Sequence, residues 1–447
     1  MRNIALFFGA LLGIVESVEG YYVTPPAVSR ATNLPNKIYD WRGQKIRYQV
    51  AEPRNKNKDA PNVLLVHGLF VNSDHWRKTL SGLSEAGYRV YAMDMLGCGY
   101  SSKPHRDSPE AQLLCGERAR FKRDAENGAL IQSSGSNLFK RRNTVMQYTT
   151  SKLENVPLGT ASGATRLAHI ELRHPLASPY NFYTWADQIA DFCSEVIDPS
   201  LTKGTTLVSN SVGVISSLQA AKDYSELFNG VFIINPNFRE LHASEMPLPR
   251  LTVPFLKIVQ CLLRTRGQSL FDAMAKPKTV AKILREPYKV HSAIDEELVD
   301  VLLSPLLTKG AADVVFDTLS YSSGPLPEQI LGDENFPRET VPVWVCYGKD
   351  DPWTPNARVE RLIKYYPQVE KVVGFDNVGH CPHDESPELV NPLLVKFLER
   401  IHKKSALKEA WQREFEHQLN IGDNKTWRGV NNRKPFSLPT KRLVNSF

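Results

Sequence analysis

Apolar residues occur in two alternating patterns along much of the chain. Short apolar runs, typical of buried strands, occur at Asn62–Val66, Tyr88–Met93, Gly230–Asn235, Val341–Cys346 and Val369–Phe375. Stretches with apolar residues three and four positions apart predict helices at Trp76–Ala86, Tyr183–Ile197, Arg358–Tyr366 and Pro387–Arg400. Strands alternating with helices predict an α/β fold, with a mostly parallel central sheet and helices on both faces.

Three regions depart from this alternation. Lys37–Ala51 alternates around a glycine and predicts an antiparallel hairpin at the edge of the sheet. Residues 105–177 are charged and rich in Ser, Asn and Gly, which predicts a mostly flexible insertion. Residues 237–336 carry Pro-punctuated amphipathic segments and predict a helical cap over the sheet. The core is therefore predicted at residues 37–104, 178–236 and 337–400.

The segment Thr205–Gly213, T-T-L-V-S-N-S-V-G, runs from a strand pattern directly into a helix pattern. A strand that turns sharply into a helix, with a serine at the apex, is typical of the nucleophile elbow of α/β-hydrolases. Ser211 is at the apex, and the small residues Ser209 and Gly213 flank it. The alternative is a serine-rich loop between strand and helix in another doubly wound sheet.

The ends of the other predicted strands favour the elbow. In this fold the catalytic acid and the histidine follow the serine in that order. Asp351 follows the strand Val341–Cys346, and His380 follows Val369–Phe375. The strand Gly230–Asn235 ends without a carboxylate, which assigns the acid to the later strand.

These residues predict a Ser-His-Asp triad. The hydroxyl of Ser211 needs an adjacent base to become a nucleophile, and His380 supplies the imidazole. Asp351 would orient His380 and stabilise its cationic form. Asp350 is the competing acid, and we prefer Asp351 because Pro352-Trp353 follows it and fixes the loop.

Other polar residues near these strand ends receive supporting roles. The backbone N–H groups of Leu69 and Val212 are predicted to bind the oxyanion. His67 is predicted to be structural, packing behind the oxyanion loop. His383, in Pro-flanked and acidic surroundings, is predicted to lie on the surface. Asp94, in the turn D-x-x-G-x-G-x-S, is predicted to cap that turn rather than to act in catalysis.

The predicted chemistry is acyl transfer to water, with an ester favoured over an amide or a thioester. A serine at the apex argues against epoxide-hydrolase and dehalogenase chemistry, which needs an aspartate there. The sequence has no glycine-rich phosphate loop, no metal-spaced cluster and no dinucleotide fingerprint. We therefore expect neither a cofactor nor a metal.

Charge and length restrict the partners. The 447 residues can accommodate a hydrolase domain of about 300 residues. The net charge of +7 comes from residues 400–447, with 11 Lys or Arg and 4 Asp or Glu. The body is near neutral, so we expect no nucleic-acid partner. The basic tail, residues 401–447, is predicted to be solvated, and peripheral membrane association is the alternative. Nothing in the sequence indicates the oligomeric state.

The N-terminus and the cysteines bear on the compartment. Ile4–Val15 is an apolar run too short to span a bilayer but suited to a signal-peptide core. The following stretch contains Ser, Thr, Pro and Arg, so residues 1–36 are predicted to be a two-part plastid presequence, with secretion as the alternative. The six cysteines show no C-x-x-C spacing, which indicates reduced thiols.

Several longer motifs point to one group of hydrolases. They are H-G-L-F-V-N-S-D-H-W (67–76), D-M-L-G-C-G-Y-S-S-K-P (94–104), Y-N-F-Y-T-W (180–185), N-S-V-G (210–213), Y-S-S-G-P-L-P-E (321–328), G-K-D-D-P-W (348–353) and N-V-G-H-C-P-H-D-E-S-P-E-L-V-N-P (377–392). Through them the chain resembles the plastid hydrolases of plants and algae related to pheophytinase and chlorophyll dephytylase. Two departures are Ser209, where Gly or Cys is common, and Val214, which replaces a second Gly.

The resemblance implies cleavage of a carboxylic ester, with the phytyl ester of a chlorophyll derivative as the candidate substrate. The apolar cap residues suit a long isoprenoid or acyl chain, although they could equally serve to pack the cap on the core. Two alternatives remain. One is a general lipid or carboxyl esterase, and the other is a receptor-like relative that binds a small apolar ligand with little turnover.

Overall fold

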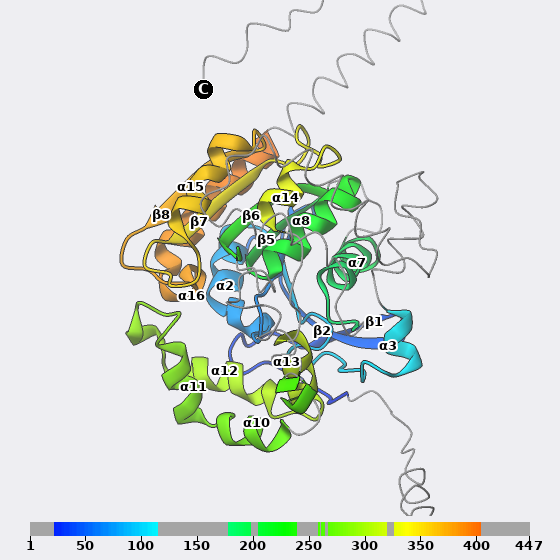
Figure 1. Cartoon of the computed structure of the whole chain (residues 1–447). Coiled ribbons are helices and arrows are strands. Elements are labelled where there is room, and N and C mark those ends of the chain that lie inside the picture. Colours follow the sequence, from blue (N-terminus) through cyan, green and yellow to red (C-terminus); the bar gives the residue numbers. More distant parts are fainter. Residues whose placement is uncertain are drawn as a thin grey trace, which may run out of the picture. The chain divides into compact units, whose positions relative to one another are not determined.

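The described residues form an eight-stranded sheet in the order β1-β2-β4-β3-β5-β6-β7-β8. Figure 1 draws its strands as arrows between helices. The structure is a computed structural model that describes residues 22–114, 178–197, 204–238, 258–259, 261–263, 267–319 and 326–403. The strands are β1 (Lys37–Trp41), β2 (Gln44–Ala51), β3 (Asn62–Val66), β4 (Arg89–Met93), β5 (Thr205–Ser211), β6 (Phe228–Pro236), β7 (Val343–Gly348) and β8 (Val369–Phe375).

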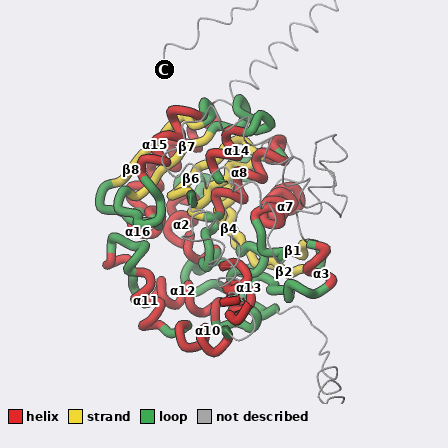
Figure 2. Tube along the Cα trace, viewed as in Figure 1, coloured by secondary structure: helices red, strands yellow, loops and turns green. Residues whose placement is uncertain are grey.

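Helices of the described residues connect and cover the strands (Figure 2). They are α2 (Arg77–Glu85), α3 (Pro109–Leu113), α7 (Phe182–Phe192), α8 (Gly213–Asp223), α10 (Gln268–Met274), α11 (Pro277–Leu284), α12 (Glu296–Leu306), α13 (Ala311–Leu319), α14 (Pro327–Gly332), α15 (Asn356–Tyr365) and α16 (Pro382–Glu385). A π-helical turn, Cys193–Ile197, continues α7. A further helical stretch runs from residue 387.

The strand pairing follows the sequence patterns. β1 and β2 form the predicted antiparallel hairpin, and β2 pairs antiparallel with β4. From β4 onward all neighbouring strands are parallel. The α/β-hydrolase fold that the sequence predicted is therefore confirmed. Parallel strands place their carboxyl ends on one edge of the sheet, which is where ligands bind in open α/β folds.

The two faces of the sheet bury alternate side chains, as the two-residue repeat of a strand requires. Leu64, Leu207 and Val231 belong to the buried cluster that also holds side chains of α7, α8, α14 and α15. On the opposite face, Phe232 and Trp344 pack against Phe397 of the helical stretch after residue 387. Apolar runs without alternation therefore mark these strands because both faces are covered.

Two of the predicted segments include helices that pack against the core. Ile330 and Leu331 of α14 join the central cluster, so this helix belongs to the core although the predicted cap extends to residue 336. Residues 105–114, placed in the flexible insertion, include α3 and end at the buried Leu114. The rest of that insertion, residues 115–177, lies outside the described residues, as does the tail from residue 404.

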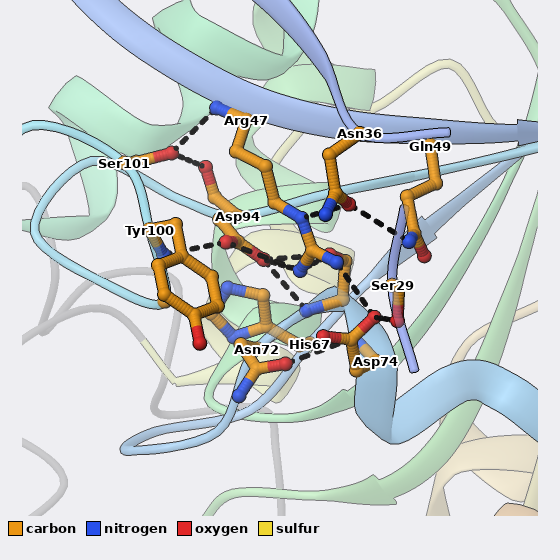
Figure 3. A network of polar contacts seen from close by, with 12 residues as sticks. Ser29, Asn36, Arg47, Gln49, His67, Asn72, Asp74, Asp94, Tyr100 and Ser101 are labelled. Atoms are coloured by element: carbon orange, nitrogen blue, oxygen red, sulfur yellow. Dashed lines mark hydrogen bonds and ion pairs between the residues drawn. The ribbon is translucent and has the colours of Figure 1, made fainter. Parts of the chain in front are cut away.

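The N-terminal segment that precedes β1 is bonded into the core. Of the predicted presequence, residues 1–36, the first 21 lie outside the described residues and residues 22–36 are described. Asn36 accepts a hydrogen bond of 2.8 Å from Nε of the fully buried Arg47. Ser29 donates one of 2.8 Å to Asp74, whose carboxylate also pairs with Arg47 at 2.6 Å (Figure 3). The folded domain therefore includes residues before 37.

Removing residues 1–36 should destabilise the protein, because it leaves Nε of the buried Arg47 without its partner and removes one hydrogen bond to the buried Asp74. Hydrogen bonds to charged groups contribute roughly 1.5–3 kcal/mol each to the free energy of unfolding. Urea unfolding should show a loss of at least that size. Removing residues 1–21 is the control, since these bonds remain, and equal stability of the two shortened chains would contradict the assignment.

Candidate active site

Ser211 lies at a sharp turn where β5 ends and α8 begins. Its backbone has φ +56°, a left-handed conformation that is strained for a serine. This strain is typical of a nucleophile elbow, which exposes the side chain at the top of the sheet. Consistent with that placement, Ser211 lines the cavity described below.

Gly213 makes the turn possible. A Cβ atom at this position would lie 2.4 Å from the carbonyl oxygen of His67 and 2.9 Å from that of Val66. Real Cβ atoms do not approach backbone oxygens so closely, so α8 can pack against the end of β3 only with glycine there. Gly68 is similarly close, because a Cβ there would lie 3.2 Å from the Cβ of Ser211. Ser211 and the predicted oxyanion loop therefore lie close together.

His380 and Asp351 are joined directly. Nδ1 of His380 lies 2.6 Å from Oδ2 of Asp351, and both side chains are buried. Burial by itself would raise the pKa of Asp351, but the hydrogen bond and charge of His380, with bonds from Thr354 and Trp353, lower it below its ordinary value. Asp350, the competing acid, instead accepts from the N–H of Asn377 and pairs with Lys289.

Asn235 holds Asp351 from the neighbouring strand. Its amide nitrogen donates to Oδ2 of Asp351 over 2.6 Å, and its amide oxygen accepts from the N–H of Gly348. Asn235 is fully buried at the end of β6, with φ +44°. The end of β6 therefore has an amide instead of a carboxylate. This amide orients the carboxylate of Asp351, which follows the neighbouring strand β7.

His67 fixes the loop after β3. The N–H of Met95 donates to Nε2 of His67 over 3.0 Å, so the ring proton is on Nδ1, which donates to the Gly68 carbonyl over 2.7 Å. In a trans peptide the carbonyl and the following N–H point in opposite directions. His67 thereby sets the direction of the Leu69 N–H. Burial lowers the pKa of His67, which keeps this tautomer neutral.

Asp94 binds the loop after β3 as well as the turn that follows β4. It acts as a turn cap and does not line the cavity described below. Its carboxylate accepts from both the N–H and the hydroxyl of Ser73, and from the N–H of Tyr100. Figure 3 shows Arg47 reaching both Asp94 and Asp74. Burial would raise the pKa of Asp94, but Arg47, His67 and the bonds from Ser73 lower it.

Glu385 connects the histidine loop to the segment between α11 and α12, which lies in the predicted cap. Its buried carboxylate accepts from four backbone N–H groups. Two belong to Gly379 and Cys381, on either side of His380, and two belong to Lys289 and Val290 between α11 and α12. The N–H of His380 also donates to the Pro287 carbonyl over 2.7 Å. The position of the histidine therefore depends on the base of the cap.

His383 is buried, so its predicted surface position was wrong. It is 1% exposed and stacks on Trp76, with its Nε2 3.4 Å from Nδ1 of His75. Nε2 of His75 in turn lies 2.7 Å from the hydroxyl of Tyr288, which donates to Asp384 over 3.1 Å. Burial lowers the pKa of His75 to about 4 and that of His383 well below its ordinary value.

A cavity of about 640 Å³ joins the elbow to the cap. Ser211, Val212, Leu69 and His380 all contribute to its wall, while Asp351 lies behind His380. The remaining wall is largely aromatic and aliphatic, with Tyr180, Phe182, Trp185, Val280, Leu284, Leu302, Leu306, Phe316 and Trp353 among its members. No Lys, Arg, Asp or Glu of the described residues lines it. The described part of the cavity wall is thus mostly apolar.

The two departures near the elbow are accommodated. Val214 is fully buried in the central cluster, where its side chain adds to the packing between sheet and helix. Ser209 is also fully buried, and its hydroxyl has no hydrogen-bond partner among the residues the structure describes.

Asn235 and Glu385 were not identified from the sequence. The only signal for Asn235 was its place at a strand end beside the predicted acid. Glu385 lies five residues after His380, and no local pattern shows that it bonds to the cap. In the described part of the chain, no group of three His, Cys, Asp or Glu residues could hold a metal ion, and no helix is long and apolar enough to cross a membrane.

Comparison with known proteins identifies a family. Residues 63–393 match the family described as "Alpha/beta hydrolase family". Over 386 residues the chain is 24% identical to the chloroplastic pheophytinase of Arabidopsis thaliana. The match covers 83% of this chain and 68% of that protein.

Two solved structures have the same fold. One is a serine hydrolase involved in carbazole degradation, the CarC enzyme, with a TM-score of 0.51 and 15% identity. The other is epoxide hydrolase I of potato (Solanum tuberosum), with a TM-score of 0.50 and 15% identity. Each match covers 82% of this chain and 99% of the other chain.

Replacing Glu385 with Gln should lower both stability and activity. The amide removes the charge and sets its own N–H groups against backbone donors on the histidine loop. We expect a loss of roughly 1.5–3 kcal/mol in the free energy of unfolding, with a lower kcat. Glu388→Gln, an exposed neighbour, is the matched control. Unchanged stability in Glu385→Gln would contradict this role of Glu385.

Stability should fall as the pH is lowered from about 6.5 toward 4. A buried His75 with a pKa of about 4 stays mostly neutral until the pH approaches 4, while the unfolded chain takes up a proton near the ordinary value of 6.5. The unfolded state then binds more protons, so the free energy of unfolding decreases with acidification, by about 3 kcal/mol for His75 alone. Urea unfolding at a series of pH values measures this, and a flat profile would contradict it. His75→Gln should show a shallower slope.

Proposed function

Because the chain belongs to the alpha/beta hydrolase family, we propose that it is a serine hydrolase that cleaves carboxylic esters carrying a long apolar chain. One observation carries the proposal. Ser211 projects from a strained elbow into an apolar cavity that it shares with His380, whose ring is bonded to the buried Asp351. We assign these three residues the roles of nucleophile, base and orienting acid toward an apolar ester in this cavity.

In the first step, Oγ of Ser211 attacks the ester carbonyl carbon and its proton passes to Nε2 of His380. Nδ1 of His380 donates to Asp351, which stabilises the imidazolium. Among the described residues, Ser211 and His380 are not hydrogen-bonded to each other. Such contacts are often long in the absence of substrate and shorten in the complex.

The N–H groups of Leu69 and Val212 would bind the negative oxygen of the tetrahedral intermediate. Val212 is the N-cap residue of α8, so its N–H precedes the helical hydrogen bonds. Collapse of the intermediate breaks the ester C–O bond, and His380 gives its proton to the leaving alcohol. Water, deprotonated by His380, then hydrolyses the acyl-enzyme and releases the carboxylic acid.

The substrate we propose is the phytyl ester of a chlorophyll derivative. The wall of the cavity, rich in aromatic and aliphatic side chains, suits an isoprenoid chain, and its volume lies within the usual range of ligand sites, roughly 300–1,000 Å³. The similarity to chloroplastic pheophytinase supports both this substrate and a plastid location. The serine at position 211 disfavours epoxide hydrolysis, although an epoxide hydrolase shares the fold.

Ser211→Ala should abolish ester turnover while leaving the unfolding midpoint unchanged. The assay measures turnover of pheophytin, chlorophyll and a series of p-nitrophenyl acyl esters by the wild-type protein and by the variant. Serine-dependent release of phytol is expected. Turnover of simple esters alone would indicate a general esterase, and labelling of Ser211 by a fluorophosphonate without turnover would indicate a ligand-binding relative. Activity that survives in Ser211→Ala would overturn the triad.

A further inference from the structure

The cap presents apolar side chains to solvent around the opening of the cavity. Met274, Ile283 and Leu319 both line the cavity and are 47%, 48% and 47% exposed. They come from three different helices, α10, α11 and α13. Side chains that touch both the cavity and solvent mark its opening, so the opening itself is apolar.

The apolar surface continues outward along α10. Leu270 is 48% exposed and precedes Met274 by four residues, which places both on one face of the helix. Neither α10 nor α11 has a fully buried residue. A gathering of exposed apolar side chains at a binding site is typical of a surface that contacts a partner or a membrane.

Basic residues border this surface. Lys276, Lys278 and Lys282 are exposed, and none of them forms an ion pair with another residue in the described part of the chain. Residues 270–289 contain five Lys or Arg and two Asp or Glu. The acidic residues that begin α12, Glu296 and Glu297, lie beyond this segment. Positive charge beside apolar side chains is the composition of helices that lie on anionic membranes.

We propose that α10 and α11 dock the protein on the surface of an anionic lipid bilayer. Leu270, Met274 and Ile283 enter the apolar boundary of the bilayer, while Lys278 and Lys282 contact its headgroups. The cavity then opens toward the lipid, where an apolar ligand is concentrated. A second copy of the chain fits less well, because a symmetric contact would bring the lysines of both copies together.

The test measures flotation with vesicles, using full-length protein that carries Ser211→Ala. Because binding is measured without turnover, the outcome does not depend on the proposed ester hydrolysis. Vesicles of phosphatidylcholine alone are compared with vesicles that also contain phosphatidylglycerol. We expect stronger binding to the anionic vesicles. Lys278→Glu with Lys282→Glu should weaken it by at least about thirtyfold, and Leu270→Asp by at least about tenfold.

Matched controls are exposed residues on other elements. Lys58→Glu with Lys396→Glu repeats the charge change, and Ile363→Asp on α15 repeats the apolar-to-acidic change. These variants should bind as before. Equal binding by the cap variants would assign binding to another part of the chain, such as the N-terminal apolar run or the basic tail, and overturn the proposal, as would equal losses in the controls or no binding at all. Dimers that dissociate in Leu270→Asp would also overturn it, in favour of a second copy.

Discussion

The close approach of α8 to the end of β3 is the constraint on which the rest of the site depends. The carbonyl oxygens of Val66 and His67 occupy the space that a side chain at Gly213 would need. Only this approach puts the turn at Ser211 beside the loop after β3. The left-handed backbone of Ser211 is maintained because the sheet and the helix around it are fully packed.

Polar contacts then fix the parts that come from distant segments of the chain. The backbone of His380 is hydrogen-bonded to Asn210 of the elbow and to the carbonyl of Pro287. Glu385 accepts hydrogen bonds from the residues before and after His380. Asp351 is held by Asn235 as well as by His380. Such support would keep the proposed reacting groups in position, as preorganised catalysis requires. By contrast, α10 and α11 bury no side chain fully, which suits the contact with a lipid bilayer that we propose for them.

Much of the fold was predictable because the strands are covered on both faces. Their apolar runs predicted β3 and β8 with the bounds observed, and the others within a few residues. Boundaries were less predictable. Residues 22–36 looked like part of a presequence, yet Ser29 and Asn36 bond into a buried charge network. Their partners Asp74 and Arg47 are remote in sequence, so no local pattern could reveal those bonds.

The sequence by itself predicted where the candidate catalytic residues lie: a serine at a tight turn, then an aspartate and a histidine after later strands. It could do so because glycine at a close contact and residues at strand ends are local signals. Only the tertiary structure decided that Asn235 orients the acid, that Glu385 ties the histidine loop to the cap, and that His383 is buried. These depend on which side chains meet across the sheet edge, and short-range patterns carry no information about such contacts.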